Sequence, residues 1–133
     1  MTNEEIDLAI QEDLKDLRVQ KLSGLNEGDR VENYVSTFME NIDNENFEAA
    51  YEVLYKDFKE NFFPTYASFE DYVKNKFPTL MSLEHTNIER NGDVYVVWTT
   101  VYDMMKSRDE GLEINFVVQE YGIDDYVLSF QVN

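Results

Sequence analysis

Cysteine is absent from this sequence, and histidine, proline and basic residues are scarce. Without cysteine the chain has no disulfide, no thiol nucleophile and no thiolate metal site, although the redox compartment stays open. The only histidine, His85, cannot by itself form a catalytic triad or a metal site with several histidine ligands. Only 11 basic residues stand against 28 acidic ones, which gives a net charge of −17. Because such a charge repels phosphate backbones, we expect no direct nucleic-acid binding.

Long apolar runs are missing as well. No stretch approaches the ~20 residues that cross a bilayer, so we expect no membrane span. The acidic start of the chain, with Glu4 and Glu5, is unlike the basic start of a signal peptide. Two locations remain open. The protein is cytoplasmic if Met1 is its native start, or lies on the extracytoplasmic side of a cell membrane if the chain is an ectodomain excised from behind a signal or anchor.

Aromatic residues, in contrast, are plentiful at 14% of the 133 residues. A chain of this length is typical of one domain with its own core. The aromatic residues recur at helix and strand periods, which predicts a packed core under an acidic shell rather than disorder.

The first half of the chain has helical periodicity. Thr2 and Glu5 form a capping-box pattern, which a narrow apolar stripe follows: Ile6, Ile10, Leu14 and Leu17. We therefore expect an outlying charged helix and its link over residues 1–28, and a single α+β domain over residues 29–133. The most regular helix of that domain begins near Asp29, with apolar positions at Val31, Tyr34, Val35, Phe38, Met39 and Ile42. Further helices are predicted over 47–58 and 68–77.

From residue 80 the period changes to two, which predicts four antiparallel strands joined as a meander, with a hairpin turn at Asn91-Gly92. The second strand is apolar on both faces. Helices would cover one face, and a partner or a partly closed cavity the other. We therefore expect a homodimer through the sheet, or another protein partner. The expected pocket or interface residues are Tyr95, Val97, Trp98, Thr99, Val101 and Val117, while Trp98 is also expected in the core.

One phrase of the sequence, Phe47-Glu48-Ala49-Ala50-Tyr51-Glu52-Val53-Leu54, precedes further helical aromatic residues and the closing sheet. Together these features resemble the nuclear transport factor 2-like superfamily, and within it they are most similar to domains of Gram-positive envelope proteins. The resemblance covers about residues 29–133. It implies N-terminal helices packed on a strongly bent, cone-like antiparallel sheet of four strands, with a pocket or dimer surface on the concave side. Members include isomerases, dehydratases, transport factors and domains without catalysis.

The isomerases and dehydratases of that superfamily use a carboxylate or histidine base with a tyrosine or second acid. The candidates here are Asp103, His85 and Tyr102, but none lies in a motif that matches the family. A solvated strand end is the better explanation of Asp103, and ordinary hydrogen bonding is the better explanation of His85. No cofactor and no metal are expected. The leading hypothesis is a non-catalytic binding or scaffold domain, and the function alternatives are a small-molecule lyase or isomerase and an acidic inhibitor or immunity-type protein that binds a basic partner.

Overall fold

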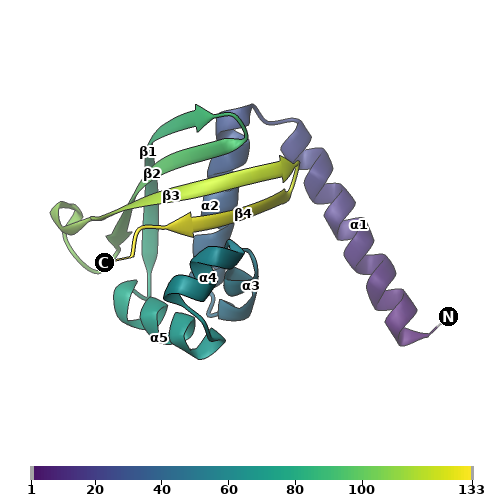
Figure 1. Cartoon of the computed structure of the whole chain (residues 1–133), viewed down its shortest axis with the longest axis horizontal. Helices are drawn as coiled ribbons and strands as arrows, with labels where there is room; N and C mark the ends of the chain where they lie inside the picture. Colours follow the sequence, from purple (N-terminus) through teal and green to yellow (C-terminus); the bar gives the residue numbers. More distant parts are fainter. Residues whose placement is uncertain (1, 133) are drawn as a thin grey trace.

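The computed structural model describes residues 2–132, which form an α+β fold as expected. Five helices come first and a four-stranded antiparallel sheet follows (Figure 1). The helices are α1 (Asn3–Ser23), α2 (Glu27–Asp43), α3 (Phe47–Glu52), α4 (Lys56–Phe62) and α5 (Tyr66–Lys76). The strands are β1 (Met81–Asn91), β2 (Val94–Asp103), β3 (Leu112–Gly122) and β4 (Asp125–Phe130), with a 3-10 turn at Arg108–Glu110 between β2 and β3.

The sheet is a simple meander in the order β1-β2-β3-β4, as the sequence predicts. The turn between β1 and β2 contains Gly92 at φ 68°, a left-handed conformation that glycine adopts without strain. The pairing is interrupted by irregularities between His85 and Asn87 and between Glu120 and Gly122. The sheet is open, and the strong bend that the cone implies is not confirmed.

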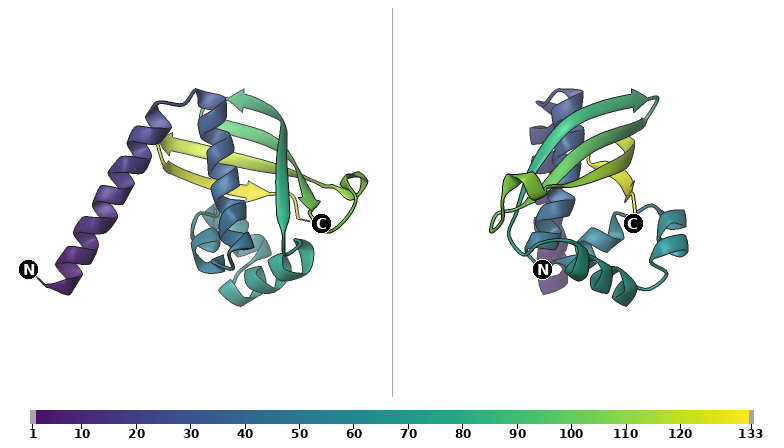
Figure 2. Two further views of the ribbon diagram at one scale, coloured as in Figure 1. Left: turned by 180° about the vertical axis from the view of Figure 1, so that it is seen from behind. Right: turned by 90° about the vertical axis from the view of Figure 1, so that its left-hand side faces the viewer.

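The core lies between α2 and one face of the sheet. Figure 2 shows α2 crossing this face when the molecule is seen from behind. All six apolar positions expected to face inward along α2 are buried. Phe38 is at the centre, with its ring 6.3 Å from that of Phe69, 6.1 Å from Phe116 and 5.9 Å from Phe130. Offset and edge-to-face ring pairs of this kind stabilise a core beyond the area that they bury.

The single helix predicted over 47–58 is wrong, because the chain leaves the helical conformation between α3 and α4. The amide of Leu128 donates to the carbonyl of Val53 at 2.9 Å, and the amide of Tyr55 donates to the carbonyl of Leu128 at 2.8 Å. Residues 53–55 thus add backbone hydrogen bonds to the outer edge of β4. Covering an edge strand in this way removes a site where other chains could pair.

Helix α1 begins with the predicted capping box of Thr2 and Glu5 and runs to Ser23. Only its last turns contact the rest of the domain. Leu22 is buried in the core, and Arg18 forms an ion pair with Asp124 at 2.9 Å. The remainder of α1 projects away from the domain beside the β3–β4 turn (Figure 1).

Candidate functional site

The two faces of β2 have different roles. Tyr95, Val97, Thr99 and Val101 are at most 3% exposed and belong to the core beneath the helices. Val117 lies directly opposite Val96 in the pairing of β2 with β3, and opposite residues share a face. The sequence prediction placed the four inward residues together with Val117, but the register separates them onto opposite faces. Trp98, which was also expected in the core, is only half-buried on the outer face.

The outer face carries an apolar surface that we call the outer patch. Its members are Val94, Val96, Trp98, Val117 and Val127. Val96 lies beside Val117, while Val94 and Val127 lie on either side of Gln119. No helix of residues 2–132 crosses this face in Figure 1, where the strands lie in front of α2. Charged side chains lie at the rim of the outer patch. Glu89 on the edge strand β1 pairs with Val96, and Glu113 on β3 pairs with Thr100.

A groove of about 250 Å³ runs along the β4 side of the outer patch. Its lining residues are Tyr55, Val94, Val117, Gln119, Val127, Leu128 and Ser129. The groove is smaller than the roughly 300–1,000 Å³ of sites for small organic ligands. It contains no charged residue, so apolar side chains of a docking protein fit it best.

The three catalytic candidates are not brought together. In the pairing of β1 with β2, His85 lies opposite Thr99 and Met81 opposite Asp103, so His85 and Asp103 are about 13 Å apart along the strands. Tyr102 points to the other face from Asp103, where its hydroxyl donates to Glu84 at 3.1 Å. The guanidinium of Arg108 covers the Tyr102 ring at 4.3 Å.

Asp103 ends its strand as a turn residue. Its carboxylate accepts a hydrogen bond of 2.9 Å from the amide of Met105, which stabilises the start of the loop. It also lines an open depression of about 500 Å³, whose other charged residues are Lys76, Lys106 and Glu110. This depression brings no histidine or tyrosine to Asp103.

His85 connects α2 to the sheet. Its Nε2 lies 3.0 Å from the hydroxyl of Ser36 on α2, and its Nδ1 lies 2.8 Å from the hydroxyl of Thr99 on β2. Both ring nitrogens are therefore occupied by neighbouring hydroxyl groups. Burial lowers the pKa of His85, although the negative charge of Glu32 acts in the opposite direction.

We expect the fold to lose stability as the pH falls through the range in which an unfolded histidine becomes protonated, near 6.5. The unfolded chain binds that proton more readily than the folded chain, so acidification favours unfolding until the lower folded pKa of His85 is passed. Urea unfolding of the wild type and of His85→Gln at pH 5 to 8 would measure this. The free-energy difference between the two proteins should shrink on acidification, and a constant difference would contradict the prediction.

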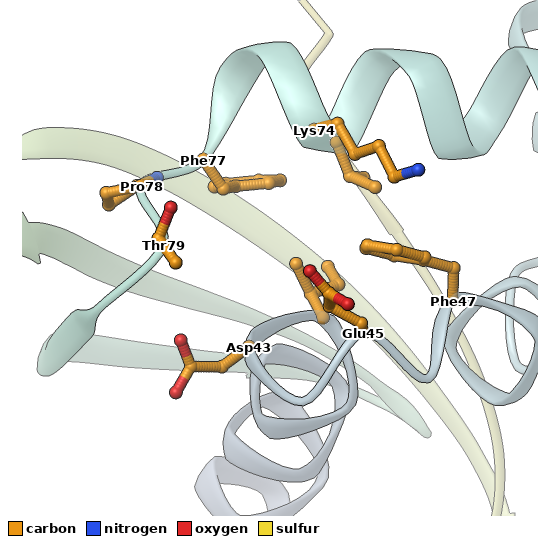
Figure 3. A pocket seen from close by; sticks show the side chains of 9 residues that line it. Asp43, Glu45, Phe47, Lys74, Phe77, Pro78 and Thr79 are labelled. Atoms are coloured by element: carbon orange, nitrogen blue, oxygen red, sulfur yellow. The ribbon is translucent and has the colours of Figure 1, made fainter.

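A small cavity of about 80 Å³ lies where the ends of α2 and α5 meet (Figure 3). Asp43, Glu45 and Thr79 surround it on one side. On the other side the amine of Lys74 lies 5.4 Å from the centre of the Phe47 ring and 3.0 Å from Glu70. The charge of Lys74 is thus already compensated, and the cavity is too small for an organic ligand.

One polar cluster was not predicted from the sequence. Arg30 donates two hydrogen bonds, of 2.8 and 2.7 Å, to the carboxylate of Glu120. The hydroxyl of Tyr34 donates to the same carboxylate and accepts the amide of Asp124 at 2.8 Å. The signal for it was Glu120 itself, an acid in register with the inward positions Phe116 and Val118. A charge at such a position needs a partner, and here the groups satisfy one another in a structural role.

Among the side chains that the structure describes, which do not include that of Asp109, no group of three histidine, aspartate or glutamate residues is arranged to hold a metal ion. None of the helices of residues 2–132 combines the length and apolarity needed to cross a membrane. Comparison of the chain with models of protein families, with curated proteins and with solved structures finds no match.

Proposed function

We propose that this chain is a non-catalytic binding or scaffold domain that acts through the outer face of its sheet. The observation that carries the proposal is the outer patch, an uncharged apolar surface on the face that the helices leave open. Soluble proteins rarely leave such a patch on a central strand uncovered unless it binds something. The partner we favour is a second copy of the chain, which gives a homodimer through the sheet.

The filled interior supports this proposal over the lyase or isomerase alternative. Such an enzyme needs an open cavity in which its acid, base and tyrosine converge. The core between the helices and the sheet is instead filled by buried rings, namely Phe38, Phe58, Phe63, Phe69, Phe116 and Phe130.

The architecture also supports a finer proposal of relationship. Helices on one face of a four-stranded antiparallel meander agree with the order of elements in the nuclear transport factor 2-like superfamily, many members of which bind without catalysis. We therefore propose that the domain is a cone-like member of this superfamily. If it belongs among the domains of Gram-positive envelope proteins that its sequence resembles, its place is on the extracytoplasmic side of a cell membrane.

Sedimentation equilibrium of the full chain tests the dimer. Each chain carries a charge of −17, so repulsion opposes association at low salt. Apolar contact is not screened, whereas charges farther apart than about 10 Å are screened at ~0.1 M salt. We expect the dimer to tighten between about 50 and 500 mM salt. An acidic inhibitor bound to a basic protein would show the opposite dependence.

Val96→Lys, at the centre of the outer patch, should weaken the dimer at least ~10-fold, because a lysine ammonium would have to be buried in an apolar contact. Leu80→Lys is the matched control, since Leu80 is exposed immediately before β1 and lies outside the patch. The single tryptophan, Trp98, gives a second measurement, because its emission should shift to the red when the dimer is diluted. A chain that stays monomeric at every salt concentration would refute the dimer.

A further inference from the structure

A second apolar surface without a partner lies on α1. We define the α1 stripe as Ile6, Ile10, Leu14 and Leu17, which are 41–60% exposed. α1 contacts the domain only through its last turns, and the projecting part, residues 3–17, is about as long as the isolated helices of ~12–15 residues that are marginally stable in water. A surface that buries the stripe would therefore stabilise the helix as well.

The stripe points away from the chain's own domain. Successive residues of a helix are about 100° apart, which places the half-buried Val19 opposite the centre of the stripe and Leu22 about 125° from that centre. Leu22 is the residue that enters the core. Turning the stripe onto the sheet of the same chain would remove Leu22 from the core and break the ion pair of Arg18 with Asp124. The stripe is thus available to another molecule only.

The stripe and the outer patch have similar dimensions. From Ile6 to Leu17 the helix rises about 17 Å. The patch measures about 13 Å along β2 from Val94 to Trp98 and about 10 Å across the spacings from β2 to β4. The groove beside β4 could accept one leucine or isoleucine side chain of the stripe.

We infer that α1 of each copy lies across the outer patch of a second copy, so that two chains exchange their helical arms around a two-fold axis. This inference rests on the proposed homodimer and names the segment that covers the sheet. Stable complexes bury about 1,200–2,000 Å² in total, and the two-fold axis doubles the area of each arm contact. Packing of sheet against sheet would leave both stripes in water, whereas the exchange of arms covers both kinds of surface.

The charges of α1 are compatible with this contact. Among the acids of the helix, only Asp7 and Asp13 flank the stripe, and the others lie farther around it. The centre of the outer patch is uncharged, so no acid of α1 needs to be buried against another acid there. The remaining repulsion is between the rims, and salt screens it.

Three single variants of the full chain test the inference by sedimentation equilibrium at high salt. Leu14→Glu charges the stripe, and Val117→Lys charges the outer patch. Leu8→Glu is the matched control, because Leu8 is 59% exposed on the same helix but on the side away from the stripe. Circular dichroism checks that each variant is folded. We expect each of the first two variants to weaken the dimer at least ~10-fold, and the control to leave it unchanged.

The double variant Leu14→Glu/Val117→Lys should recover part of the affinity, since the new glutamate of each copy would meet the new lysine of the other. Loss of dimer in Val117→Lys alone would mean that the sheets pack face to face, which refutes the arm exchange and keeps the proposed homodimer. Loss in Leu14→Glu alone would mean that α1 pairs with α1, and a monomeric wild type would refute both proposals.

A cross-link gives a direct measurement, because the chain has no cysteine of its own. Leu14→Cys and Val117→Cys chains are mixed and oxidised, with Leu8→Cys replacing Leu14→Cys as control. A disulfide requires Cα atoms within about 7 Å. We expect the mixed disulfide between positions 14 and 117 to form faster than the control. Equal rates for both cysteine positions on α1 would overturn the inference.

Discussion

Replacing Phe38 with alanine is expected to lower the free energy of unfolding by about 3–5 kcal/mol. Phe38 is fully buried, and its ring contacts those of Phe69, Phe116 and Phe130 from α5, β3 and β4. Removing the ring loses its transfer free energy and leaves a cavity that three separate elements would have to move to fill. Because the three neighbours belong to different elements, we expect little collapse and a cost near the upper end of the range.

Urea unfolding followed by far-UV circular dichroism measures this loss. Phe62→Ala is the matched control. Phe62 is 52% exposed and lies at the margin of the cluster, where its ring is 5.2 Å from that of Phe58. We expect the control to lose less than about 1 kcal/mol, as exposed substitutions usually do. Similar midpoints for the two variants would show that the aromatic cluster does not hold α2 against the sheet.

Much of the fold could be predicted from periodicity. The helical spacing of Val31, Tyr34 and Val35 identified the buried face of α2, and Asn91-Gly92 identified the first hairpin. These predictions succeed because a helix with one apolar face, or a turn that requires positive φ, leaves its mark within a few neighbouring residues.

The orientation of β2 could not be predicted in this way. Alternation divides its residues into two sets, but Trp98 and Val96 are as apolar as Tyr95 and Val97, so composition does not show which set faces the helices. Only the register with β3 decides which set faces the helices, and this register places Val117 beside Val96. The break between α3 and α4 was missed for a similar reason, because it depends on hydrogen bonds with the distant residue Leu128.

The outlying helix α1 has one feature that the sequence predicted and one that it did not. The capping box of Thr2 and Glu5 and the exposed stripe agree with the prediction of a charged helix outside the core. Leu22 was predicted to lie in the link that follows the helix, yet it is buried at the end of α1. A single anchoring residue leaves no period to detect, so the sequence could not reveal which side of the helix faces the domain.

The second large effect is expected from Arg30, the partner of Glu120. The side chain of Arg30 is only 18% exposed and that of Glu120 only 10%, so the two charges depend on each other for stabilisation. Arg30→Met retains the apolar stem of the side chain and leaves the carboxylate of Glu120 with the hydroxyl of Tyr34. We expect a loss of roughly 3 kcal/mol at pH 7, the lower end of the cost of breaking a buried pair, because both groups still touch water.

The pH dependence separates this charge effect from a simple loss of packing. Burial alone would raise the pKa of Glu120, but the hydrogen bonds from Arg30 and Tyr34 and the charge of Arg30 outweigh it and hold the pKa below its usual range. Stability from this carboxylate is therefore complete above about pH 4.3, the pKa of an unfolded glutamate, and is lost as the pH falls through the lower folded pKa. In Arg30→Met the burial is no longer compensated, so the penalty should be largest at neutral pH and should shrink as the pH falls through the raised pKa of Glu120 in the variant towards its lower pKa in the wild type. Urea unfolding of both proteins from pH 3 to 7 measures the difference.

The double variant Arg30→Met/Glu120→Leu should be more stable than Arg30→Met at pH 7, since no unpaired carboxylate remains. A penalty that is the same at pH 3 and pH 7 would mean that Arg30 stabilises the fold through its stem and not through its charge.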